Sequence, residues 1–156
     1  MAQLGKPAPP WRIAEWVNGE PDLTSKVVVA LAFQMLCPGC ATQALPQMSR
    51  VRAAFGEADV AVVGLHTVFE HHDAMTPAAL KAFAHEYRYA FPIGVDEPSP
   101  DGGIPATMAA YNMQGTPTLL LIDREGRLRR QAFGHVPDLQ LGAEIMARAL
   151  ESPAGG

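Results

Sequence analysis

Cysteine is scarce in this sequence of 156 residues, which contains only Cys37 and Cys40. Two cysteines exclude a disulfide-rich scaffold, and a bridge between residues so close in sequence would close a loop too short to add much stability. Their C-x-x-C spacing instead indicates either thiol–disulfide chemistry or one half of a metal site.

Long hydrophobic runs and an excess of positive charge are also missing. The longest purely apolar run, residues 27–33, is too short to span a bilayer, and the first eleven residues lack the pattern of a secretory signal. The net charge of −4 excludes the basic patch that nucleic-acid binding needs. We therefore expect a cytoplasmic protein with neither a membrane nor a nucleic-acid partner, or a periplasmic one if a leader has been removed.

What remains is an ordinary globular composition, with 48% hydrophobic and 18% charged residues. A chain of this length can bury a core of its own. The sequence predicts a single domain over residues 1–150, followed by a flexible C-terminal tail over residues 151–156.

Apolar periodicity predicts strands that alternate with helices. The expected strands are residues 11–17, 27–33, 60–65, 91–95, 118–122 and 128–133, and the expected helices are 38–55, one from 77, 106–113 and one from 138. This order is typical of an α/β fold with a mainly parallel sheet between helices. Residues 123–126 form a hairpin turn, which adds an antiparallel edge.

The Cys37-Pro38-Gly39-Cys40 motif falls where a buried strand ends and a helix begins. A helix N-terminus stabilises a thiolate through its free N–H groups and its dipole. We expect Cys37 to be the nucleophile and Cys40, one helical turn further, to resolve the mixed disulfide. The alternative is a pair of buried, inert cysteines.

A second motif, Thr116-Pro117, leads directly into an apolar strand. Proline cannot donate a hydrogen bond to a sheet, so it is tolerated only at the start of such a strand. An ordinary turn proline is the simple interpretation. Together with the C-x-x-C motif, a cis Thr116–Pro117 bond becomes the preferred one.

These motifs resemble the thioredoxin superfamily, specifically its ResA/TlpA-like and AhpC/TSA-like redoxin branch. The resemblance rests on residues 5–9, on residues 27–33 followed by CPGC, and on residues 112–128. It implies a thioredoxin-like fold, in which helices flank a central mixed sheet, with an N-terminal extension and a helix–strand insertion at residues 77–95.

The resemblance also implies roles for individual residues. Pro117 would pack beside the cysteines, and Thr116 would offer backbone hydrogen bonds to the substrate. The substrate would be a protein or small-molecule thiol or disulfide, with a reducing or oxidising redox partner and with no cofactor or metal. Pro38, Gly39 and His66 are candidates for the rim of the site.

Three departures from the family pattern concern the surroundings of Cys37. Leu36 replaces the usual tryptophan, and Leu31 replaces a buried acid that helps to move protons. Pro46 lies nine residues after Cys37, whereas the family's helix-kinking proline lies eight after. One residue rotates a helical position by about 100°, so the kink is not expected to align.

Histidines follow the strand that ends near residue 65. His66 stands at a carboxyl end, where open α/β sheets place their sites, so we expect it near Cys37, modulating the thiol without being essential. As imidazolium it would favour the thiolate, and as neutral imidazole it could relay a proton. His71 and His72, with the acidic residues around them, indicate a solvated loop or, alternatively, metal ligands.

Two alternative functions stay open at this point. A thiol peroxidase would use Cys37 to attack peroxide and Cys40 to condense with the sulfenic acid. However, Ala30 and Gln34 occupy the proline and hydroxyl positions of the peroxiredoxin pattern. A non-enzymatic metal carrier would use both cysteines and a histidine, but a cis-proline beside them would crowd out further ligands.

Overall fold

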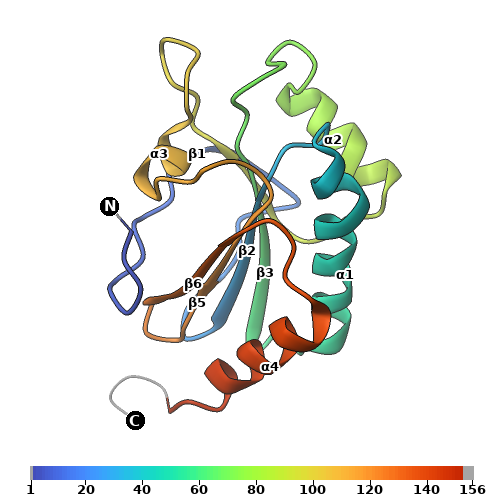
Figure 1. Ribbon diagram of the computed structural model, residues 1–156. Coiled ribbons are helices and arrows are strands. Elements are labelled where there is room, and N and C mark those ends of the chain that lie inside the picture. Colours follow the sequence, from blue (N-terminus) through green and yellow to red (C-terminus); the bar gives the residue numbers. More distant parts are fainter. Residues whose placement is uncertain (1, 153–156) are drawn as a thin grey trace.

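The structure, a computed structural model, describes residues 2–152 and is shown in Figure 1. Its elements are β1 (Ile13–Val17), β2 (Val27–Phe33), the π-helix η1 (Cys40–Ala44), α1 (Leu45–Ala54), β3 (Val60–His66), α2 (Pro77–Glu86), β4 (Ile93–Asp96), α3 (Ala106–Ala110), β5 (Thr118–Ile122), β6 (Leu128–Phe133) and α4 (Asp138–Ala149).

The six strands form one mixed sheet in the order β1-β4-β3-β2-β5-β6. The three central strands β4, β3 and β2 are parallel, which matches the expected βαβ pattern. The β5–β6 hairpin adds the predicted antiparallel edge next to β2. A second antiparallel edge, formed by β1 against β4, had no signal in the sequence.

Two hydrophobic cores sandwich the sheet. In Figure 1, α1, α2 and α4 cover one face, and α3 with the N-terminal segment covers the other. Every residue of β2 is buried, because Val27, Val29 and Leu31 face the first core while Val28 and Ala30 face the second. This explains the unbroken apolar run, which predicted a strand covered on both faces.

Local signals set several boundaries. Helix α2 begins where predicted, since the Thr76 hydroxyl accepts a hydrogen bond from the backbone N–H of Ala79 (3.2 Å). Helix α3 ends at Ala110, earlier than expected, because Asn112 adopts a left-handed conformation (φ 49°). Strand β4 starts at Ile93, two residues late, directly after Pro92, which has no N–H to pair.

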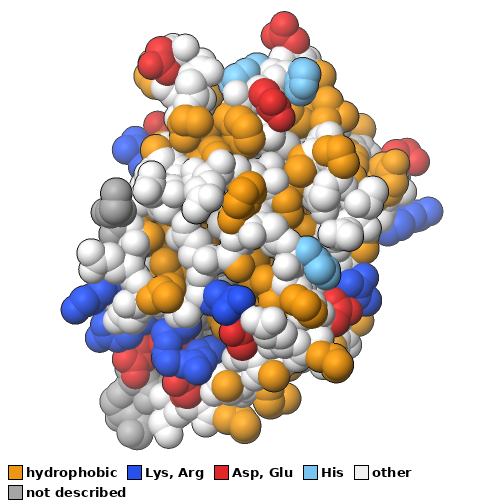
Figure 2. Space-filling view, in the orientation of Figure 1, with side chains coloured by type: hydrophobic (Ala, Val, Ile, Leu, Met, Phe, Trp, Pro, Cys, Tyr) orange, Lys and Arg blue, Asp and Glu red, His pale blue; other side chains and the backbone are white. Residues whose placement is uncertain are grey.

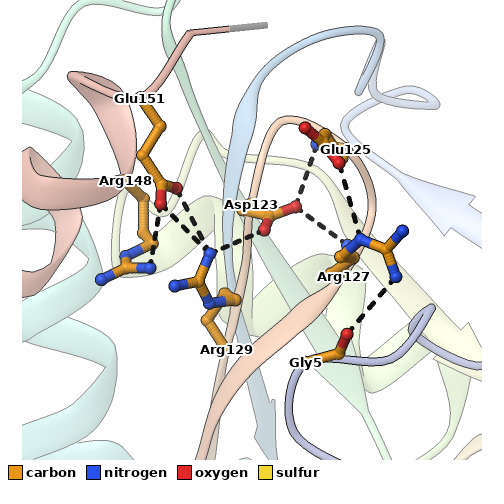
Figure 3. Close-up of polar contacts among 7 residues, drawn as sticks. All are labelled: Gly5, Asp123, Glu125, Arg127, Arg129, Arg148 and Glu151. Carbon is orange, nitrogen blue, oxygen red and sulfur yellow. Dashed lines mark hydrogen bonds and ion pairs between the residues drawn. The ribbon is translucent and has the colours of Figure 1, made fainter. Parts of the chain in front are cut away.

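The β5–β6 hairpin carries an ion-pair network, shown in Figure 3. The carboxylate of Asp123 accepts hydrogen bonds from the backbone N–H groups of Glu125 (2.9 Å) and Arg127 (3.0 Å), which fixes the turn. Arg129 pairs with Asp123 (3.0 Å) and with Glu151 (3.2 Å). Glu151, at the start of the predicted tail, is therefore tied to the domain, while residues 153–156 lie outside the described residues.

Within residues 2–152, no helix is long and apolar enough to cross a membrane. The cytoplasmic location stays a prediction.

Candidate active site

Cys37 lies at the N-cap of the helix that follows β2. Helical residues begin at Pro38, and the carbonyl of Cys37 accepts the first intrahelical hydrogen bond, from Ala41 (3.0 Å). A turn precedes it, in which the backbone N–H of Cys37 donates to the carbonyl of Gln34 (3.0 Å). The predicted strand-to-helix position of the motif is therefore confirmed.

The two thiols are free but differ in exposure and acidity. Cys37 is partly exposed, whereas Cys40 is completely buried. Burial and contact with Cys37 raise the pKa of Cys40 to about 12. Burial opposes ionisation of Cys37 as well, but hydrogen bonds from the Cys40 thiol and from nearby backbone N–H groups prevail and lower its pKa.

The Thr116–Pro117 bond is cis, as the sequence predicted, and it lies beside the cysteines. The thiol of Cys37 donates to the carbonyl oxygen of Thr116 (3.6 Å). A Cβ placed on Gly39 would lie 3.6 Å from Cδ of Pro117, so the CPGC turn packs directly against the proline. Thr116 and Pro117 thus form one wall of the thiol site.

Apolar side chains lie exposed around this wall. Leu36, next to Cys37, is 56% exposed, and Phe133, at the end of β6, is 57% exposed. The ring of Phe133 lies against Gly115, which precedes Thr116. Figure 2 shows apolar side chains spread over this face of the molecule, with a cluster of Lys and Arg side chains at its lower left.

The helix after the cysteines contains a π-turn that the sequence analysis missed. Residues Cys40–Ala44 form η1, in which the N–H of Leu45 bonds to the carbonyl of Cys40, five residues back. A π-turn holds one residue more than an α-turn, which can absorb the extra residue before Pro46. Pro46 follows inside the same continuous helix, which runs from Pro38 to Ala54, so its missing N–H removes one regular helical hydrogen bond directly after the π-turn.

His66 lies next to β2, as expected, but it is buried rather than at the rim. It pairs with Phe33 across the parallel strands, and its Nε2 accepts a hydrogen bond from the backbone N–H of Met35 (3.2 Å). Burial lowers the pKa of His66 to about 4. Of the two roles considered for His66, the lowered pKa favours the neutral imidazole at neutral pH, and its Nε2 holds the turn before Cys37.

Burial of a neutral His66 makes stability depend on pH. Its folded-state pKa of about 4 lies below the ordinary histidine pKa of 6.5, so the unfolded chain binds this proton first as the pH falls. Between pH 7 and pH 5 the free energy of unfolding should drop by about 2 kcal/mol from this group. Urea denaturation at both pH values should show that drop in the wild type.

The variant His66→Gln offers an uncharged acceptor in place of Nε2, so its loss between pH 7 and pH 5 should be smaller by about 2 kcal/mol. His72→Gln, at an exposed position, is the matched control and should behave like the wild type. Equal pH dependence in wild type and His66→Gln would contradict a buried neutral histidine.

The remaining histidines of this loop, His71 and His72, are exposed. Among the residues that the structure describes, no group of three or more His, Cys, Asp and Glu side chains is arranged to hold a metal ion. The solvated-loop interpretation therefore fits the geometry, and the metal-carrier hypothesis finds no ligand set there.

Gln34 is the residue of this site that sequence reasoning overlooked as a functional group. Its side chain is buried, and it reaches both Phe69 and Thr116. The only signal in the sequence is a polar residue placed between a buried strand and the CPGC motif. That signal indicates a turn as readily as a site.

Known proteins resemble this chain in sequence and in fold. The model of the AhpC/TSA family matches residues 7–131. The thiol-disulfide oxidoreductase ResA of Bacillus thuringiensis (strain Al Hakam) is 26% identical over 144 residues, which cover 89% of this chain and 75% of the relative.

Two solved structures are closely similar in shape and sequence. A protein described as a thioredoxin-like superfamily protein is 56% identical with a TM-score of 0.91, over 96% of this chain and 99% of its own. A thiol-disulfide isomerase from Corynebacterium glutamicum is 44% identical with a TM-score of 0.91, over 95% of this chain and 99% of its own.

Proposed function

The chain belongs to the AhpC/TSA family of the thioredoxin superfamily, and on that basis we propose that it is a thiol–disulfide oxidoreductase working through a reversible Cys37–Cys40 disulfide. One observation carries the proposal. The two cysteines differ sharply, since Cys37 is accessible and acidified at a helix N-terminus whereas Cys40 is buried with a raised pKa.

The mechanism follows from this asymmetry. The thiolate of Cys37 attacks one sulfur of a substrate disulfide, forms a mixed disulfide and releases the other substrate sulfur as a thiolate. Cys40 then gives up its proton to a released thiolate and attacks the sulfur of Cys37. The products are a dithiol substrate and a Cys37–Cys40 disulfide, which a dithiol partner reduces again. In the opposite direction the same steps oxidise a substrate dithiol.

The wall beside Cys37 supports a substrate with a peptide backbone. In this proposal, ionisation of Cys37 removes the proton that its thiol donates to the Thr116 carbonyl, and that carbonyl then accepts a backbone N–H of the substrate chain. Leu36, next to Cys37, and Phe133, against Gly115, are exposed and offer apolar contact. These features favour a protein or peptide disulfide over a small charged one, and they require a separate redox partner.

Proton transfer to and from Cys40 receives no help from a buried acid at position 31. Leu31 is buried in the core that also contains Cys40. The burial that raises the pKa of Cys40 therefore slows the resolving step, because less of this thiol is ionised. Mixed disulfides with Cys37 should persist longer as the pH is lowered.

The test compares two activities on one sample. We expect dithiothreitol-dependent reduction of a self-quenched peptide disulfide to be accelerated at least tenfold over dithiothreitol alone. Hydrogen peroxide should be consumed no faster than by the Cys37→Ser protein. Rapid thiol-dependent peroxide consumption without disulfide exchange would replace the proposal by the peroxidase alternative, for which the Cys37-Pro38 pair is the supporting feature.

A further inference from the structure

Gln34 joins three segments around the reactive thiol. It is the first residue after β2 and only 1% exposed, although its side chain is a polar amide. Its backbone carbonyl accepts the N–H of Cys37 (3.0 Å). A buried amide is costly unless its groups are hydrogen-bonded, so the partners of this side chain explain why it is there.

Both ends of the Gln34 amide have a partner in another loop. Oε1 accepts the backbone N–H of Phe69 (3.1 Å), in the segment between β3 and α2. Nε2 donates to the hydroxyl of Thr116 (3.5 Å), in the cis-proline loop. The short bond to Phe69 fixes the amide, and the longer bond to Thr116 reaches the residue whose carbonyl contacts the Cys37 thiol.

We propose that Gln34 is a positioning residue that holds the Thr116 backbone against Cys37, so that a peptide disulfide docks with its sulfur in line with the thiolate. This inference rests on the proposed function. Gln34 takes no part in the bond-forming steps of the proposed mechanism. An apolar side chain at position 34 would leave the Phe69 N–H without an acceptor and the Thr116 side chain without its donor.

The test separates docking of a substrate backbone from reactivity of the thiol. Gln34→Met keeps the size of the side chain but removes its hydrogen bonds. On the alkaline plateau, where Cys37 is fully ionised, exchange with a peptide disulfide should fall about tenfold. The plateau rate of alkylation by iodoacetamide, which has no peptide chain to dock, should change less than twofold.

Gln47→Met is the matched control. Gln47 is also a buried glutamine with two side-chain partners, the carbonyl of Val136 (2.6 Å) and the carboxylate of Asp138 (2.9 Å). Neither partner belongs to the cis-proline loop, and none of the hydrogen bonds of the Gln47 side chain reaches Thr116 or Phe69. Loss of the Gln47 amide should lower stability, but both rates should stay within twofold of the wild type.

A double-mutant cycle tests whether Gln34 acts through Thr116. Thr116→Val removes the hydroxyl and should show the same selective loss of peptide exchange. If the two residues acted independently, the fold losses of peptide exchange in the single variants would multiply in the double variant. The loss of peptide exchange in the double variant should be at least threefold smaller than that product. If Gln34→Met does not fold, Thr116→Val alone still decides, because unchanged peptide exchange in that variant overturns the proposal.

Three other results would also overturn it: unchanged peptide exchange in Gln34→Met, equal losses of exchange and alkylation, or fully additive effects in the cycle. A wild-type protein that does not exchange with the peptide at all would instead contradict the proposed function itself.

Discussion

Replacement of Cys37 by serine is expected to abolish thiol–disulfide exchange, with a loss of at least about a thousandfold, because a serine hydroxyl does not ionise near neutral pH. Cys40→Ser should behave differently. It retains the acidified Cys37 thiolate but lacks the resolving sulfur, so the mixed disulfide with substrate should accumulate. Non-reducing electrophoresis and mass spectrometry of each variant with a peptide disulfide measure both effects.

The burial of Cys40 explains why the two variants should differ. Cys40 is closed off from solvent, so in the Cys37→Ser protein it should form no adduct with the same peptide. Adducts at Cys40 in that variant, or turnover by it, would reverse the assignment of nucleophile and resolving cysteine.

The rates of alkylation of the two thiols should differ by a similarly large factor. The pKa of Cys40 is about 12, and that of Cys37 lies below the ordinary thiol pKa of 9.0. At pH 7 the thiolate fraction of Cys37 should therefore exceed that of Cys40 by at least about a thousandfold. Iodoacetamide, followed by peptide mapping, should label Cys37 first and leave Cys40 unmodified.

Urea-unfolded protein is the control for this measurement. Unfolding removes burial, the helix N-terminus and the contact between the thiols, so both cysteines should then react at similar rates. Equal rates in the folded protein would show that the fold does not distinguish the thiols, and the mechanism proposed above would lose its basis.

Much of the fold follows from local patterns in the sequence. The apolar residues 27–33 indicated a buried strand, and Thr76-Pro77 indicated the start of α2, because both depend on residues close in the chain. The pairing of β1 with β4 depends instead on residues about 80 positions apart. The sequence of a short strand does not indicate which other strand it pairs with, so this second antiparallel edge could not be predicted.

In the candidate site, too, features set by local motifs could be predicted, whereas contacts between distant segments could not. Cys37, Cys40 and Pro117 form motifs with a defined spacing, and the structure brings all three together. His66 was expected near Cys37 from strand order alone, which gives its neighbours but not its burial. The contacts of Gln34 with Phe69 and Thr116 join three loops, and no single stretch of sequence contains them.

The π-turn at residues 40–44 illustrates a different limit. Counting residues showed that Pro46 is displaced by one position, and a regular α-helix would have turned that displacement into a rotation. The helix instead widens by one residue over a single turn. Sequence spacing can reveal an extra residue, but the backbone geometry that absorbs it depends on how α1 packs against the sheet.

Redox titration of the wild-type protein tests the central claim most directly. The protein is equilibrated with mixtures of reduced and oxidised dithiothreitol, trapped with acid and an alkylating agent, and analysed by intact mass. We expect one reversible two-electron transition, in which the oxidised form has lost two hydrogens and carries a Cys37–Cys40 disulfide. A protein that keeps both thiols across the whole titration, or that oxidises only to sulfenic acid or intermolecular dimers, would contradict the account.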